Sequence, residues 1–240
     1  DTEDGVPQGE SLSPLLANVY LHYVLDQWFE RDVKPRMRGE AYLIRYADDF
    51  IVGFELESDA VRYQSVLPKR LARFSLTAAE DKTKLIRFGR FARRECQRLG
   101  EGAPQTFDFL GFTHYCGTSR AGRFKLKRKT STKKLRMKLL DLKRWFWKQL
   151  DTPIGEMWHT LNAKLRGHYQ YYGINDNWPL LMAYRDHARR MAKRHISRRS
   201  QNSYFSWAKF NAFLKENPLA SPTRLTDLIA MSREGSAVAK

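Results

Sequence analysis

The stretch from Tyr42 to Phe54 constrains the chain more than any other, because two apolar runs flank the adjacent acids Asp48 and Asp49. Runs rich in β-branched and aromatic residues, interrupted by a short polar pair, predict a β-hairpin. We therefore expect strands over 42–47 and 50–54, with both carboxylates at the tip. Aspartate is common in solvated turns. Unpaired acids beside a core are nevertheless costly, and this context favours a functional role.

Carboxylates held on a rigid turn suit magnesium chemistry on phosphates. Mg²⁺ is a hard cation that prefers oxygen ligands and is usually bound by one or two acids together with substrate phosphate. Two such ions can stabilise both the attacking and the leaving oxygen of a displacement. We therefore expect Asp48 and Asp49 to bind Mg²⁺.

The positive charge of the chain is confined to one block. The 240 residues carry a formal net charge of +17. Residues 117–200 contain 22 lysines and arginines against 5 acids, and the remainder of the chain is neutral. Such a block indicates a polyanionic partner, nucleic acid before a membrane surface. We place a domain boundary where the composition changes, between residues 116 and 117.

The remaining totals exclude several classes of protein. Cys96 and Cys116 form no Cys-x-x-Cys pair, so neither a structural zinc site nor a disulfide framework is expected. No apolar run reaches transmembrane length, and no signal peptide is visible. The chain begins with Asp1 rather than Met, and we expect it to be a piece of a longer protein.

Periodicity and turn residues outline the other elements. Apolar positions at helical spacing predict helices over 13–29, 58–74, 130–150 and 179–199. In the first of these, the predicted inner face is Leu16, Val19, Tyr20, Tyr23 and Val24. A short strand is expected over 85–88, a strand or turn over 107–115, and loops over 31–41 and 90–105.

Five blocks of this sequence, in order, resemble those of group II intron-encoded reverse transcriptases. The box Tyr46-Ala47-Asp48-Asp49 resembles the Tyr-x-Asp-Asp motif of that family. The block at 161–173 resembles its maturase-specific region. The other three blocks are residues 5–18, 74–86 and 107–112.

This resemblance implies an α+β fold in three parts. Residues 1–116 would be the C-terminal part of a reverse-transcriptase palm, with the hairpin of the box and its helices. Residues 117–215 would be an α-helical thumb and maturase-specific RNA-binding region, and residues 216–240 a tail. The family's earlier palm strand, which carries another aspartate, and its fingers would lie before Asp1.

The resemblance also assigns roles within the palm. Asp48 and Asp49 would be the catalytic metal ligands. Lys82 would contact the triphosphate or protonate the pyrophosphate leaving group, although a surface lysine is an equally good interpretation. The nucleotide and template pocket is expected to include Gln8, Gly9, Asn18 and Tyr46, and for Asn18 simple packing remains open.

The basic block is expected to bind RNA. A merely soluble helix would intersperse glutamates and gain from i, i+4 pairs, and these helices have few acids. Aromatic side chains between 158 and 178 either stack on unpaired bases or belong to the core. The expected RNA contacts are Lys133, Lys134, Arg136, Lys138, Lys143, Arg144, Lys148, Arg166, His168, Tyr169, Tyr171, Arg189, Arg190, Lys193, Arg194, Arg198 and Arg199.

The resemblance implies an RNA-directed DNA polymerase that uses Mg²⁺, an RNA template, a DNA primer and deoxynucleoside triphosphates. The same protein would assist the splicing and mobility of its group II intron RNA, in the cytoplasm of a bacterial-type cell and without a membrane partner. We expect this chain alone to be inactive as a polymerase. Two alternatives remain open: an RNA-binding splicing cofactor without polymerase activity, and a general basic RNA-binding module. The oligomeric state is left open.

Overall fold

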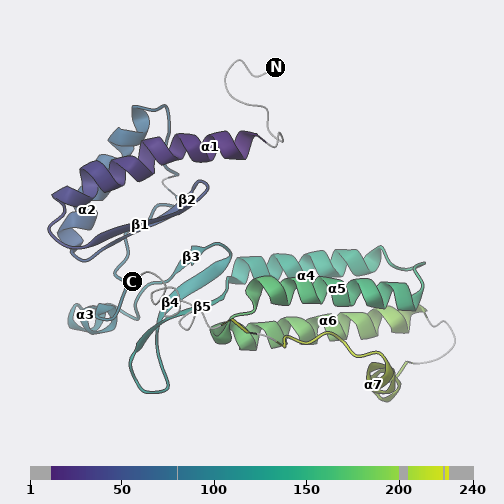
Figure 1. Ribbon diagram of the computed structural model, residues 1–240. Coiled ribbons are helices and arrows are strands. Elements are labelled where there is room, and N and C mark those ends of the chain that lie inside the picture. The colour runs from purple at the N-terminus through teal and green to yellow at the C-terminus, as the bar shows by residue number, and fades with distance from the viewer. Residues whose placement is uncertain (1–11, 80, 200–204, 224, 227–240) are drawn as a thin grey trace, which may run out of the picture. The chain divides into compact units, whose positions relative to one another are not determined.

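The computed structural model describes residues 12–79, 81–199, 205–223 and 225–226. Helices and two small antiparallel sheets make up this part of the chain (Figure 1), which agrees with an α+β fold. The chain divides into two compact units, residues 1–87 and 88–240. The expected boundary between residues 116 and 117 is therefore corrected, because it would cut strand β4 (Phe112–Thr118), which pairs with a strand on each side.

The first unit begins with a long helical segment. Helix α1 (Ser13–Leu21) starts with proline at its first turn, where a missing N–H costs nothing. It continues through two π-helical segments, η1 (His22–Gln27) and η2 (Phe29–Val33), into the 3₁₀ turn η3 (Lys34–Arg36). Most of the loop expected over 31–41 is thus helical.

The buried side of this segment agrees with the predicted one at Val24 alone. Within the described residues, α1 buries no side chain, and Val19 and Tyr23 are exposed. Burial begins at Val24 and Leu25 and continues at Phe29. The π-helical turns are wider than α-helical ones, so a strict period of 3.6 does not follow the buried side through them.

A hairpin and one helix complete the first unit. Strands β1 (Ala41–Tyr46) and β2 (Asp49–Phe54) pair antiparallel, as predicted from the sequence. Helix α2 (Glu57–Ala72) follows and contributes Tyr63, Leu67 and Leu71 to the core that also holds Val24 and Phe29.

The second unit begins with a short helix, and a three-stranded meander follows it. Helix α3 (Ala92–Arg98) lies in the segment expected to be a loop, whereas the expected strand over 85–88 is not formed. Strands β3 (Phe107–Phe109), β4 and β5 (Phe124–Thr130) then form the sheet in chain order.

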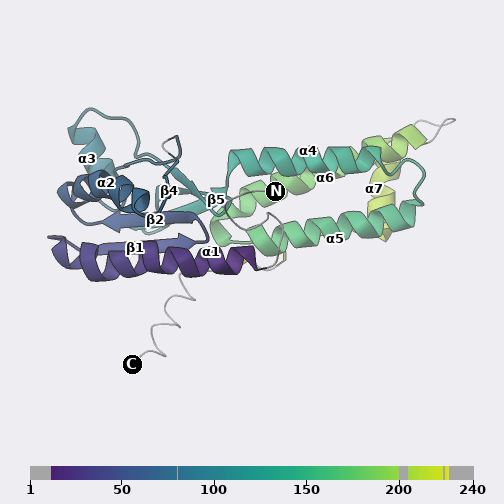
Figure 2. The same cartoon turned by 90° about the horizontal axis from the view of Figure 1, so that it is seen from above.

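Helices make up the rest of the second unit. Helices α4 (Thr132–Trp147), α5 (Ile154–Tyr172) and α6 (Trp178–Arg199) run side by side, and α7 (Trp207–Glu216) packs onto them (Figures 1 and 2). Leu219, in the segment expected to be a tail, is buried in the same core. No helix in the described part of the chain has the length and apolar character needed to cross a membrane.

A buried asparagine joins the meander to the helices. Asn177 ends the 3₁₀ turn η4 (Asn175–Asn177) and is fully buried. Its Oδ1 accepts a bond from the Thr130 N–H at 2.8 Å, and its Nδ2 donates to Thr130 Oγ1 at 2.7 Å and to the Tyr172 carbonyl at 2.9 Å. This side chain thus pairs with polar groups of the last residue of β5 and of the last residue of α5 at the same time.

Asn177→Ala is expected to destabilise the second unit by about 3 kcal/mol, because buried donors and acceptors left unpaired cost about 1–3 kcal/mol each. Thermal and urea unfolding, followed by tryptophan fluorescence, would measure the loss. The matched control is Asn175→Ala, whose exposed side chain lies in the same turn. Equal losses in the two variants would refute the role given to Asn177.

Candidate active site and nucleic-acid surface

The two acids of the hairpin occupy different positions. Tyr46 pairs with Asp49, so the turn consists of Ala47 and Asp48 alone. The expectation that both acids form the tip is corrected: Asp49 is the first residue of β2. Both side chains are exposed, and within the described part of the chain neither carboxylate has a hydrogen bond or an ion pair. Their oxygens are available to an external ligand.

The backbone of this turn is strained. Ala47 has a φ of 53°, in the left-handed region that costs an L-residue about 1–2 kcal/mol. Strain of this kind persists where the surroundings hold it, and it is concentrated at functional sites.

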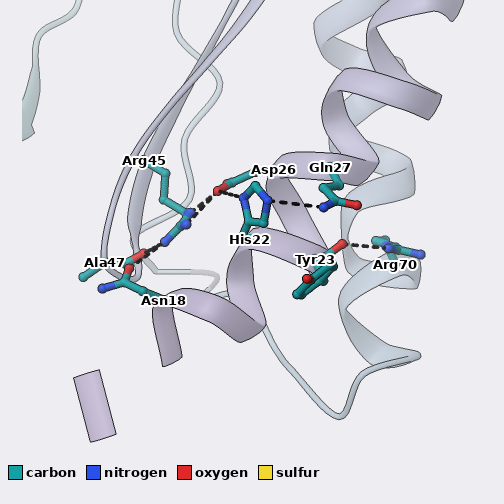
Figure 3. A network of polar contacts seen from close by, with 8 residues as sticks. All are labelled: Asn18, His22, Tyr23, Asp26, Gln27, Arg45, Ala47 and Arg70. Carbon is teal, nitrogen blue, oxygen red and sulfur yellow. Dashed lines mark hydrogen bonds and ion pairs between the residues drawn. The ribbon is translucent and has the colours of Figure 1, made fainter. Parts of the chain in front are cut away.

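Arg45 holds the turn from the inner side of the hairpin (Figure 3). Its Nε and Nη2 donate to the two carboxylate oxygens of Asp26, each at 2.7 Å. Its Nη1 donates to Asn18 Oδ1 at 3.0 Å and to the Ala47 carbonyl at 2.9 Å. The guanidinium therefore ties the helical segment of the first unit to the turn that carries Asp48.

The electrostatics of this contact favour the ionised pair. Hydrogen bonding from Arg45 is the main cause that lowers the pKa of Asp26 below its ordinary value. The same bond raises the pKa of Arg45. Both groups stay charged at neutral pH, which keeps the bidentate geometry intact.

Sequence reasoning did not identify Arg45 and Asp26 as site residues. A signal for Arg45 exists in the alternation of the strand, since Ala41, Leu43 and Arg45 share the inner face. A charged residue in an otherwise apolar inner row requires a partner. For Asp26 the sequence gives no comparable signal, because this residue lies in a π-helical segment that does not follow the α-helical period.

The other residues expected in the palm site have varied positions. Gln8 and Gly9 lie outside the described residues. Tyr46 is 65% exposed at the end of β1. Asn18 bonds to Arg45, which favours a structural contribution. Lys82 lies in an exposed turn, and within the described residues no contact joins its side chain to the hairpin.

The acids fit a magnesium site that is completed by substrate. Within the described residues, no group of three or more histidine, cysteine or acidic side chains could form a closed metal cage. Asp48 and Asp49 supply two exposed carboxylates on neighbouring residues. This donor set suits an ion that takes its remaining oxygens from phosphate and water.

Most of the predicted RNA contacts lie on the surface of the helices in the second unit. Lys133, Lys134, Arg136 and Lys138 are exposed on α4, and within the described residues none of them has an acidic partner. The other exposed residues of the predicted set are Lys143, Arg144, Lys148, Arg166, Tyr171, Arg190, Arg194 and Arg198.

Three basic residues of α6 are half-buried and contact the protein itself. Arg189 bonds to Asp186 and lies over the ring of Trp207, which Lys193 also approaches. Arg199 donates to the Thr152 carbonyl. These contacts engage the three side chains within the protein and reduce what they can offer to a phosphate.

Two predicted RNA contacts are corrected by their burial. His168 and Tyr169 on α5 are 7% and 6% exposed. The His168 ring stacks on Tyr184 with ring centroids 3.9 Å apart, and the Tyr169 hydroxyl donates to the Ala220 carbonyl. Neither side chain can reach a nucleic acid in this structure.

The aromatic block at 107–112 forms a tight hairpin turn beside a pocket. Leu110 and Gly111 both have positive φ, the pattern of a type I′ turn. A Cβ at Gly111 would lie 2.9 Å from the Tyr172 hydroxyl, so glycine is required there. The adjacent pocket, of about 390 Å³, is lined by residues that include Phe112, Arg128 and Tyr171.

Two exposed acids at a strained hairpin turn form the kind of donor set that metal-dependent phosphate transfer requires. Residues 1–114 match the family model of reverse transcriptases, described as RNA-dependent DNA polymerases. The match includes the hairpin and supports the reverse-transcriptase resemblance for this part of the chain. It ends in β4, before the basic helices. Among curated proteins, none matches the chain.

The stability of the second unit is expected to fall as the pH falls from about 6.5 to about 4. Burial lowers the pKa of His168 from 6.5 to about 4, so below pH 6.5 the unfolded chain binds a proton that the folded chain excludes. The loss approaches about 3 kcal/mol near pH 4.

His168→Phe keeps an aromatic ring against Tyr184 and is expected to remove this part of the pH dependence. Urea unfolding at a series of pH values would measure it. His159→Gln, at an exposed position of α5, is the control. An unchanged pH profile in His168→Phe would show that His168 is not buried in the neutral form.

Proposed function

We propose that the chain is part of an RNA-directed DNA polymerase and that its first unit contributes the metal-binding acids. The observation that carries this proposal is the exposed pair Asp48, in the turn, and Asp49, directly after it, with the Ala47 carbonyl of the same turn bonded to Arg45. The match of residues 1–114 to reverse transcriptases supports it. The substrates would be an RNA template, a DNA primer and deoxynucleoside triphosphates.

In this reaction the carboxylates of Asp48 and Asp49 would bind the metal ion and orient it towards the triphosphate. They supply the negatively charged oxygen ligands that Mg²⁺ prefers. These two carboxylates would hold Mg²⁺, which would supply a lower pKa for the primer hydroxyl and would neutralise charge on the transferred phosphate. Exposed Tyr46, adjacent to this turn, would contact the nucleotide.

A second function is proposed for the helices of the second unit, namely binding of group II intron RNA in a maturase role. The observation that favours it is the row of cations on α4 without acidic partners in the described residues. Dense like charges repel one another, and a bound polyanion relieves this repulsion. The protein would perform no bond chemistry here and would stabilise the folded RNA by binding that state alone.

Asp48→Asn is expected to abolish DNA synthesis by the complete protein while leaving RNA affinity nearly unchanged. Loss of a metal ligand removes several kcal/mol of transition-state stabilisation, which is about a thousandfold in rate. Primer extension with Mg²⁺ and an RNA-binding titration measure the two effects. The control is Asp32→Asn, an exposed acid that pairs with Arg36. A parallel loss of RNA binding in Asp48→Asn would contradict the separation of roles.

Replacing two lysines of α4 is expected to reduce the salt dependence of RNA binding. Each lost phosphate contact lowers the slope of log K against log salt by about 0.7–0.9, so Lys134→Ala combined with Lys138→Ala lowers it by about 1.4–1.8. Filter binding of a structured RNA at several salt concentrations would measure the slope. The control, Lys69→Ala with Lys84→Ala, removes the same charge outside the basic block. Equal slopes for the two double variants would rule out α4 as an RNA surface.

A further inference from the structure

We propose that Arg45 is a positioning residue for the Asp48 carboxylate, which it controls through the backbone of the turn. Arg45 does not touch Asp48 in any described contact. It bonds to the carbonyl of Ala47, the residue immediately before Asp48. The inference rests on the proposed function, because that function is what requires Asp48 to be positioned. The contacts of Arg45 do not depend on the proposed function.

The guanidinium is held firmly enough to act as a fixed point. It makes four hydrogen bonds, to both oxygens of Asp26, to Asn18 and to Ala47 (Figure 3). The Arg45 side chain is 12% exposed and that of Asp26 is 28% exposed. Bidentate arginine–carboxylate pairs combine strength with a defined direction, so the Nη1 that bonds to Ala47 has little freedom.

A further pair of residues orients Asp26. An ionised carboxylate can only accept, so His22 Nδ1–H donates to Asp26 Oδ2 at 3.3 Å. In the neutral ring the other nitrogen then accepts from Gln27 Nε2, also at 3.3 Å. The chain of contacts therefore runs from Gln27 through His22, Asp26 and Arg45 to the turn.

Stability alone does not account for an arginine at this position. Arg45 lies on the inner face of the hairpin, opposite Phe50 and in the same row as Leu43. This pair is half-buried, and replacing a buried ion pair by apolar residues of similar volume is often neutral or stabilising. An apolar side chain would fill the site, but it could not donate to the Ala47 carbonyl.

The hydrogen bond from Arg45 to the Ala47 carbonyl stabilises the strained conformation of the turn. Ala47 has a φ of 53°, and without a partner for its carbonyl the residue can relax towards the ordinary region of negative φ. Such a change would reorient Asp48, the next residue. Metal-binding constellations tolerate errors of only about 0.5 Å, so the bond from Arg45 protects the geometry of the carboxylate.

Arg45→Lys tests the proposal on the whole 240-residue chain. Lysine keeps the charge but cannot reproduce the fork of donors. ¹⁵N relaxation dispersion of the Ala47, Asp48 and Asp49 amides, without metal, reports microsecond-to-millisecond exchange of the turn. Line broadening of the same amides by Mn²⁺, titrated separately, reports metal affinity. Arg36→Lys is the matched control, since Arg36 is an exposed arginine that pairs with Asp32.

We expect flat dispersion for the natural chain and for Arg36→Lys, and exchange at the turn for Arg45→Lys. The Mn²⁺ concentration for half-maximal broadening should rise about tenfold in Arg45→Lys, as is typical when a supporting residue of a metal site is changed. Asp26→Asn, which keeps the shape of Asp26, should act in the same direction and serves if Arg45→Lys does not fold.

Flat dispersion in whichever of these two variants folds would overturn the inference. The proposed function fails separately: if the natural chain shows no selective Mn²⁺ broadening near Asp48, the acids are not a metal site. Exchange at the turn in the variants would still support the role of Arg45 in holding the backbone.

Discussion

The ion pair between Arg45 and Asp26 is the interaction on which the first unit's candidate site depends. It places a charge among apolar neighbours, and a lone arginine there would be costly. The cost is offset because the guanidinium of Arg45 donates hydrogen bonds to the Asp26 carboxylate, the Asn18 amide oxygen and the Ala47 carbonyl. The consequence is that Ala47 keeps its left-handed backbone conformation immediately before the exposed acid Asp48.

The two β-favouring runs that flank a polar pair predicted the hairpin well, because such runs and turn residues are local signals. The sequence could not show which acid lies in the turn, since that depends on the pairing of Tyr46 with Asp49. It also did not reveal the π-helical segment that presents Asp26, because a wider turn leaves no simple period. The predicted inner face of α1 is exposed within the described residues for a related reason: periodicity identifies an apolar side but not what covers it.

The second unit shows the same limits. Leu135, Leu139, Leu142 and Phe146 recur at helical spacing, so α4 was predictable with its buried side. The burial of His168 has a similar signal, since it follows Leu161 and Leu165 on one side of α5. The change of charge near residue 117 did not mark the boundary, however. Composition is local, whereas β4 needs partners from both sides of it.

The two proposed roles place different demands on side chains. Binding phosphates through released counterions depends on how many cations are present and tolerates movement of each one. The exposed lysines of α4, which have no acidic partner among the residues that the structure describes, meet that demand at little structural cost. Holding a metal for phosphate transfer instead depends on the position of a few oxygens. The two proposals therefore match two different arrangements in the described residues: lysines on α4 that have no acidic partner there, and a single turn held by the contacts of Arg45 with Asn18 and Ala47.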